Sequence, residues 1–180
     1  MPEANQTNKV TLYHFNEDKL TFEQDCVLLE GFPIVDSTLY HIENKWFIFL
    51  VNQKKSHTHL EIYHSNDLKG QYVAHENNPV IVDCSKARPA GKLFELDGKL
   101  IRPSQNCTEH YGQSITLEEI DLLTDKQFST KYFGEIKPIR HCDYDKGIHT
   151  INSDGNFTVF DGKRFVFTIS GFKQQLKQKI

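Results

Sequence analysis

A hairpin-like pattern occurs three times along this chain, each time as a short charged turn between two apolar runs. The three turns are Glu43-Asn44-Lys45, Asp97-Gly98-Lys99 and Asp161-Gly162-Lys163, and they begin 54 and 64 residues apart. Because Asn and Gly adopt positive φ angles at little steric cost, each segment predicts a β-hairpin. A hairpin that recurs about every 50 residues is typical of a β-propeller, whose blades are small twisted sheets.

The pattern predicts an all-β chain of about three blades, whereas propellers commonly have ~4–8. Residues 1–31 fit an outer half-blade, 32–83 and 84–138 fit complete blades, 139–170 fit an inner half-blade, and 171–180 form a polar tail. Such a partial propeller leaves strand edges unpaired, and unpaired edges promote association. We therefore expect a partner chain or self-association to complete the propeller, or the chain to be a truncated part of a larger protein.

Two segments leave the element type open. Residues 114–123 alternate polar and apolar side chains as a strand does, although Leu117, Ile120 and Leu123 also have helical spacing. We favour the strand. Residues 124–128 fit a capped turn or a short helix.

Composition excludes several classes of protein. The net charge of −3 gives no electrostatic basis for binding nucleic acid, and no apolar run approaches the ~20 residues of a membrane span. The N-terminus lacks the basic and apolar regions of a signal peptide. The four cysteines are widely spaced and predict free thiols in a reducing, cytoplasmic compartment. No phosphate-binding or dinucleotide-binding glycine motif occurs, so we expect no cofactor.

Four motifs carry a resemblance to a known family: VDSTL at 35–39, ARPAGKLF at 87–94, IRPSQNC at 101–107 and GIHTIN at 147–152. Over roughly residues 1–170 the chain resembles the five-bladed β-propeller domain in the N-terminal region of glucosamine inositolphosphorylceramide transferases. That domain is distantly similar to arabinanase and β-xylosidase-type glycoside hydrolases. Bacterial relatives carry it alone or beside formyltransferase-like or glycosyltransferase domains. The resemblance implies a carbohydrate-handling domain that is glycoside hydrolase-like or associated with glycosyl or formyl transfer.

The chain departs from that family at its start. Met1-Pro2-Glu3 resembles an internal motif of the second blade, so the first blade and most of the second have no counterpart. The related glycosidases place one carboxylate on each of the first three blades, and the first of these, the base, is missing. Whether the chain is an enzyme therefore stays open. The alternatives are a non-catalytic sugar-binding or scaffold module, or a truncated fragment of a larger propeller.

Three residues are candidates for catalysis. Hydrolysis of a glycosidic bond needs two carboxylates, and the resemblance puts Asp36 and Glu3 at axial positions. His149 opens the last inner strand, where an imidazole could exchange a proton with a substrate oxygen. The alternatives are that Asp36 caps a turn, that Glu3 is a terminal residue and that His149 is structural.

A second set of side chains suits the binding of a sugar or sugar phosphate. A planar guanidinium donates paired hydrogen bonds, and amide, phenol and hydroxyl groups complement sugar hydroxyls. The predicted binding residues are Arg88, Arg102, Gln105, Tyr111 and Thr150. The alternative is a structural network that holds the loops between blades.

Histidine, cysteine and aspartate also gather in residues 141–149, and His57 and His59 flank Thr58 in a polar loop. These residue types can bind zinc, but neither spacing matches a zinc site. We expect solvated loops and no metal.

Overall fold

The computed structural model describes residues 6–55 and 57–166, which form antiparallel β-sheets. The only helical element among these residues is the 3₁₀ turn η1, Gln53–Lys55, so the all-β prediction is confirmed. No sheet within the described ranges closes on itself. The same residues contain no helix long and apolar enough to cross a membrane.

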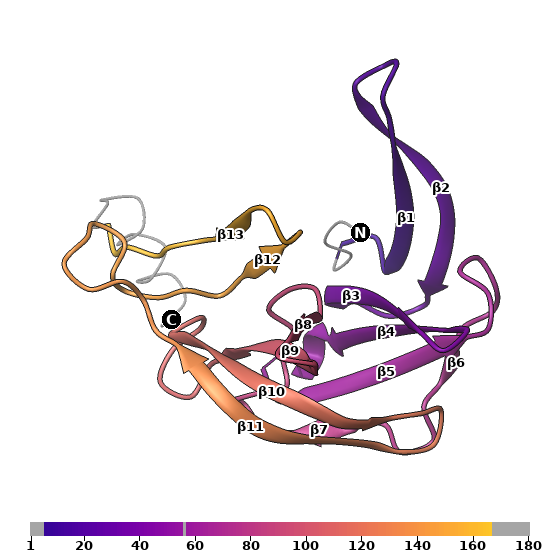
Figure 1. The fold of residues 1–180 in the computed structure, drawn as a ribbon. Coiled ribbons are helices and arrows are strands. Elements are labelled where there is room, and N and C mark those ends of the chain that lie inside the picture. Colours follow the sequence, from indigo (N-terminus) through magenta and orange to yellow (C-terminus); the bar gives the residue numbers. More distant parts are fainter. Residues whose placement is uncertain (1–5, 56, 167–180) are drawn as a thin grey trace, which may run out of the picture.

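Four sheets follow one another along the chain (Figure 1). The first is a hairpin of β1 (Lys9–Asn16) and β2 (Thr21–Glu30). The second contains β3 (Ile34–Ile42), β4 (Lys45–Asn52), β5 (His59–Ser65) and β6 (Val73–Ala74), with β7 (Ile81–Val82) also paired to β5. The third contains β8 (Phe94–Leu96), β9 (Lys99–Asn106), β10 (Ser114–Leu123) and β11 (Phe128–Ile136). The fourth is a hairpin of β12 (Ile151–Ser153) and β13 (Thr158–Phe160).

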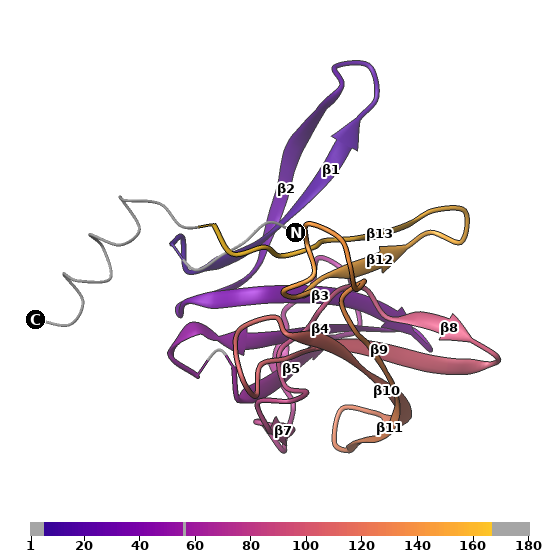
Figure 2. The ribbon, with the colours of Figure 1, turned by 90° about the vertical axis from the view of Figure 1, so that its left-hand side faces the viewer.

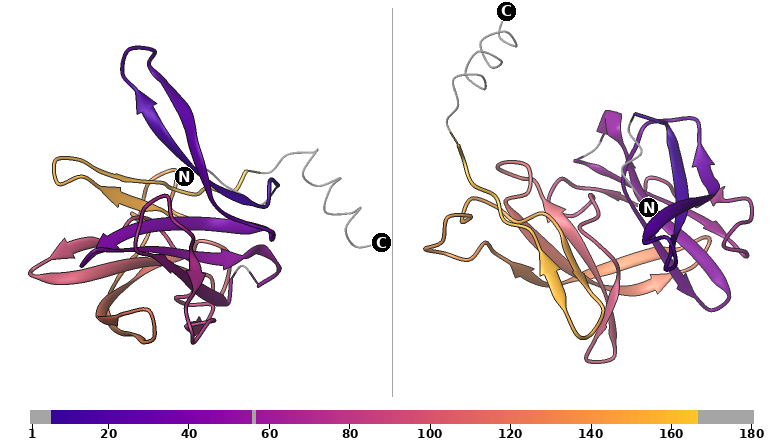
Figure 3. Two further views of the ribbon diagram at one scale, coloured as in Figure 1. Left: turned by 90° about the vertical axis from the view of Figure 1, so that its right-hand side faces the viewer. Right: turned by 90° about the horizontal axis from the view of Figure 1, so that it is seen from above.

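The two larger sheets lie inside the predicted units 32–83 and 84–138, although the unit boundaries themselves stay a prediction. The β1–β2 hairpin projects away from the larger sheets in two perpendicular views (Figures 1 and 2). Seen from above, it lies on the opposite side of the molecule from the β12–β13 hairpin (Figure 3). The two larger sheets therefore stand between two hairpins in the order of the sequence.

Two of the three predicted hairpin turns form as expected. Glu43 and Asn44 have φ angles of 48° and 65° between the paired ends of β3 and β4. Asp97 and Gly98 have φ angles of 51° and 72° between β8 and β9. Two consecutive positive φ angles are those of a two-residue turn whose twist matches the flanking strands.

The third predicted hairpin, around Asp161-Gly162-Lys163, is wrong. Strand β13 pairs backward with β12, so the turn lies at residues 154–157. The Asp154 carboxylate accepts hydrogen bonds from the amides of Asn156 and Phe157 at 2.9 and 2.8 Å, and Gly155 takes a φ of 94°. Asp154-Gly155 is the same residue pair as Asp161-Gly162, so both sites carry the local signal of a tight turn.

The ambiguous segments also resolve. Residues 114–123 form β10, which pairs with both β9 and β11, and the predicted strand is confirmed. Residues 124–127 form a turn, in which Thr124 Oγ1 accepts the amide of Gln127 at 2.8 Å.

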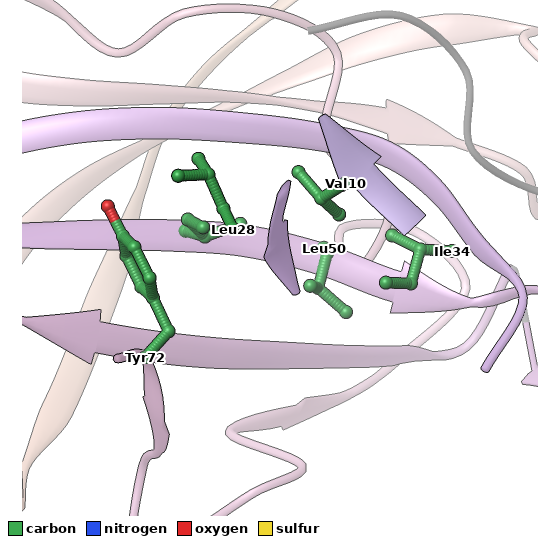
Figure 4. Close-up of a cluster of buried hydrophobic side chains, with 6 residues drawn as sticks. Val10, Leu28, Ile34, Leu50 and Tyr72 are labelled. Atoms are coloured by element: carbon green, nitrogen blue, oxygen red, sulfur yellow. The ribbon is translucent and has the colours of Figure 1, made fainter. Parts of the chain in front are cut away.

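Hydrophobic contacts lie between successive sheets. The first cluster joins the β1–β2 hairpin to the second sheet and contains Val10, Leu28, Ile34, Ile48, Leu50 and Tyr72 (Figure 4). The second lies between the two larger sheets and contains Phe47, Phe49, Leu60, Ile62, Ala87 and Leu93. The third joins the third sheet to the segment before β12 and contains Ala90, Ile101, Ile115, Leu117 and Ile148. Alternate residues of β4 serve the first and second clusters, so this strand is buried on both faces.

Candidate functional site

A β-bulge in β3 positions Asp36. The β3–β4 register shifts between Val35 and Thr38, and Asp36 has a φ of 50°. Aspartate tolerates this left-handed conformation better than most residues, and a bulge redirects the side chain at its position. The Asp36 carboxylate pairs with Arg88 Nε and accepts a hydrogen bond from Gln105 Nε2 at 2.9 Å. Asp36 therefore links the second sheet to the third.

The partners of Asp36 are fixed on the third sheet. Residues 88–90 run beside β9, where the Gln105 amide donates to the Arg88 carbonyl at 2.7 Å. Gln105 Nε2 also donates to the Pro89 carbonyl at 2.9 Å. The Gln105 side chain is fully buried, and its Oε1 has no hydrogen-bond partner among the described residues. A buried acceptor without a partner costs free energy.

Tyr111 brings two histidines to the same place. The Arg88 guanidinium carbon lies 4.8 Å from the centre of the Tyr111 ring, a cation–π distance. The rings of His57 and His149 lie 5.7 and 5.2 Å from that ring. Arg88 Nη1 also lies 3.4 Å from His57 Nδ1. Burial and the charge of Arg88 lower the pKa of His57, while burial raises the pKa of the Tyr111 phenol.

Asp161 holds His149 and Thr150. Its Oδ1 accepts the amides of His149 and Thr150 at 2.9 and 2.8 Å and the Thr150 hydroxyl at 3.2 Å. Its Oδ2 pairs with His149 Nδ1. Burial opposes ionisation of Asp161, but the two amide hydrogen bonds, the charge interaction with His149 and the Thr150 hydroxyl together outweigh it and lower the pKa of this carboxyl.

These side chains form one continuous group, here called the polar cluster: Asp36, His57, Arg88, Gln105, Tyr111, His149 and Asp161. The cluster reaches a cavity of about 520 Å³ through Asp36, and the rest of the cavity lining is Leu12, residues 37–39 and 89–92, Thr150 and Asn152. A side chain at Gly91 would collide with the Ile151 carbonyl, and the Ile151 amide donates to the Ala90 carbonyl at 2.8 Å. This close approach joins the third sheet to β12 at the wall of the cavity.

Comparison with known proteins decides the family. The family model described as "Glucosamine inositolphosphorylceramide transferase 1, N-terminal" matches residues 1–153. The chain belongs to this family.

Two relatives named glucosamine inositolphosphorylceramide transferase 1, from Oryza sativa subsp. japonica and Arabidopsis thaliana, are each 31% identical over 134 residues. The aligned part is 71% of this chain but 18% and 17% of those relatives. The chain thus spans less than a fifth of their length. No solved structure matches it. The predicted resemblance to the N-terminal region of these transferases is confirmed.

In this family member, the structure brings together Asp36, Arg88, Gln105, Tyr111 and His149 of the predicted residues, with Thr150 beside them through Asp161. Glu3 lies outside the described residues. Two members of the polar cluster were not predicted as site residues. His57 lies in an irregular loop, and Asp161 carried the signal of a hairpin turn.

Arg102 lies apart from the polar cluster. Both it and Glu118 are 1% exposed, and they form an ion pair across β9 and β10. Arg102 also donates to the Lys86 carbonyl, while Glu118 accepts from the Thr130 hydroxyl at 2.7 Å. These contacts favour a structural role over the predicted role in binding.

Other features offer less chemistry. A cavity of about 530 Å³ between the end of β11 and β12–β13 has a mostly apolar lining that includes Ile136, Ile148 and Phe160. Within residues 6–55 and 57–166, no group of three or more His, Cys, Asp or Glu side chains could hold a metal ion. The polar cluster combines convergent polar groups with a neighbouring cavity, the usual features of a ligand site.

Proposed function

We propose that this chain is a carbohydrate-handling domain of a glycosyltransferase-related protein, and that the polar cluster is its sugar-binding site. The observation that carries the proposal is that polar side chains from three parts of the chain converge beside one cavity. Asp36 pairs with Arg88 and Gln105, and Tyr111 connects Arg88 to His149. Asp36 borders the cavity of about 520 Å³. The relatives' names support a sugar ligand, since they describe a transferase that acts with glucosamine and inositolphosphorylceramide.

The chemistry of the cluster suits a polyol. Sugar hydroxyls both donate and accept, so a sugar site needs carboxylate or carbonyl acceptors and guanidinium or amide donors at fixed positions. Asp36 supplies a carboxylate acceptor and Arg88 supplies guanidinium donors, while the Thr150 hydroxyl, whose proton goes to Asp161, keeps its oxygen as a second acceptor. A phosphate on the sugar would add charge that Arg88 can bind.

Binding is a better account of this geometry than independent hydrolysis. Glycoside hydrolysis requires two carboxylates that face one bond, ~5–5.5 Å apart for retention or ~6.5–9.5 Å for inversion. Asp36 is engaged by both Arg88 and Gln105. The second predicted carboxylate, Glu3, is outside the described residues. The glycoside hydrolase-like function is thus the second candidate, and it depends on carboxylates supplied by other parts of the assembly.

We further propose that the sheets are successive blades of a β-propeller completed by a partner chain or a second copy. Each hydrophobic cluster lies between neighbouring sheets, as the packing of blades requires. The two terminal hairpins expose aromatic side chains, including Phe15 and Phe22 on β1–β2 and Phe157 and Phe160 near β13. Exposed apolar patches of this kind mark surfaces that other protein covers. The cysteines, which are free thiols among the described residues, are consistent with the proposed cytoplasmic location.

The proposed site can be tested by titrating ¹⁵N-labelled protein with glucosamine and with myo-inositol 1-phosphate. We expect signals from the polar cluster to shift, and Arg88→Ala to weaken the binding about tenfold or more, since a hydrogen bond to a charged group contributes ~1.5–3 kcal/mol. Arg140→Ala is the matched control, because Arg140 is exposed and outside the cluster. Absence of binding by the wild-type chain, or equal affinity in a folded Arg88→Ala variant, would refute the proposal.

A further inference from the structure

Asp161 contacts His149 at both the backbone and the ring. One carboxylate oxygen accepts the His149 amide at 2.9 Å, and the other pairs with ring Nδ1. The same carboxylate accepts the Thr150 amide at 2.8 Å, so its position relative to the backbone is fixed. A carboxylate held by its own hydrogen bonds orients an imidazole more strictly than a flexible one.

Gly112 confines the histidine from another direction. A Cβ atom at this glycine would lie 2.7 Å from the His149 Cβ, closer than real Cβ atoms approach one another. The Gly112 carbonyl also accepts the amide of Ile148 at 2.9 Å, so the two segments are joined beside the ring. Gly112 has a φ of 64°, which suits glycine. His149 is thus held between Asp161 and the loop that carries Tyr111.

We propose that Asp161 is a positioning residue that fixes neutral His149 as the Nδ1–H tautomer and presents Nε2 as a hydrogen-bond acceptor for a sugar hydroxyl. This inference rests on the proposed sugar-binding function. The tautomer of a histidine follows from the hydrogen bond made by its other nitrogen, and a carboxylate at Nδ1 can only accept. His149 Nε2 makes no hydrogen bond among the described residues, and the side chain is 33% exposed. The ring, which lies beside Tyr111, therefore keeps a free acceptor.

Charged and titratable groups surround the His149 ring. Asp161 contacts the His149 ring directly, and the Tyr111 phenol ring lies beside it. Beyond Tyr111 are Arg88, His57 and Lys163, whose Nζ lies 5.9 Å from the Tyr111 ring centre. A hydroxyl that donates to Nε2 requires the neutral imidazole, because the imidazolium form donates from both ring nitrogens.

The tautomer can be measured directly by long-range ¹H–¹⁵N correlation of the histidine rings at about pH 8, where an ordinary histidine is neutral. We expect His149 to be the Nδ1–H tautomer in the wild-type chain. In Asp161→Asn, the amide keeps one oxygen for the backbone donors and turns an N–H towards Nδ1, so we expect the Nε2–H tautomer. Asp154→Asn is the matched control, since Asp154 caps two amides of the same hairpin without contacting a histidine. An Nε2–H tautomer in the wild type, or no change in Asp161→Asn, would overturn the inference.

Binding gives the second readout. If glucosamine or myo-inositol 1-phosphate binds, we expect Asp161→Asn and His149→Phe to weaken it about threefold to tenfold, and Asp154→Asn to leave it unchanged. An affinity unchanged in a folded His149→Phe variant would refute the role of Nε2. Failure of the wild type to bind either probe would refute the proposed function, while the tautomer measurement still decides the role of Asp161.

Discussion

Replacing Glu118 by alanine tests whether Arg102 is a structural residue or a binding residue. Glu118 and Arg102 are each 1% exposed, and their ion pair lies between adjacent positions of β9 and β10. In Glu118→Ala the guanidinium keeps its hydrogen bond to the Lys86 carbonyl but loses its carboxylate partner. Burial already lowers the pKa of Arg102, because desolvation disfavours its charged form.

The expected loss is large because the charge that remains is buried. Removal of one partner from a buried ion pair costs about 3–5 kcal/mol, a substantial share of the ~5–15 kcal/mol that stabilises a typical domain. The Thr130 hydroxyl also loses its acceptor, which adds to the cost. With a urea slope of about 1–3 kcal/mol per molar, the midpoint of unfolding should fall by about 1 M or more.

Urea unfolding followed by Trp46 fluorescence and by circular dichroism measures this loss. The double variant Arg102→Met with Glu118→Leu removes both charges and should recover most of the stability, since apolar replacements of a buried pair are often neutral. Glu30→Ala is the exposed control: Glu30 and Lys9 are 63% and 51% exposed, and their pair should contribute about 0–1 kcal/mol. A Glu118→Ala loss no larger than the Glu30→Ala loss would refute the structural assignment. A folded double variant with unchanged sugar binding would exclude Arg102 from the site.

Three further predictions concern Gly91, the acid stability of the fold and the oligomeric state. Gly91→Ala should lower the free energy of unfolding by more than about 1 kcal/mol, because its Cβ collides with the Ile151 carbonyl at a φ of 146°, whereas Gly98→Ala at an open turn should cost less. The pKa of Asp161 in the folded chain is lowered below the ordinary 3.8, so its ionised form stabilises the fold above pH 3.8. This contribution is lost as the pH falls through the folded pKa. Between pH 6 and about pH 3, urea unfolding should therefore show a smaller decrease in the free energy of unfolding for Asp161→Asn than for the wild type. Light scattering on a size-exclusion column should give a mass above 20.9 kDa, and a monodisperse monomer would contradict the proposed second copy or partner.

Local turn chemistry explains which parts of the fold the sequence predicts. Glu43-Asn44 and Asp97-Gly98 each supply two residues that tolerate positive φ between apolar runs, and both hairpins form. Asp161-Gly162 has the same local signal, but the capped turn at Asp154 competes for strand β13 and forms instead. The two possible turns lie 7 residues apart, and their spacing alone does not show which one forms. The outcome depends on the hydrogen bonds that each aspartate makes in the folded chain.

The same limit applies to the polar cluster. Asp36, Arg88 and His149 could be predicted because each one precedes or opens an apolar run, so strand geometry places them at strand ends. His57 reaches Arg88 from an irregular loop, where no periodicity relates sequence position to direction. Asp161 shows the consequence most clearly. Its side chain acts 11 and 12 residues back along the chain, on Thr150 and His149, and it is free to do so only because the hairpin turn forms elsewhere. The wrong prediction of the turn and the missed site residue therefore have one cause: Asp161 does not form the hairpin turn, and its carboxylate contacts His149 instead.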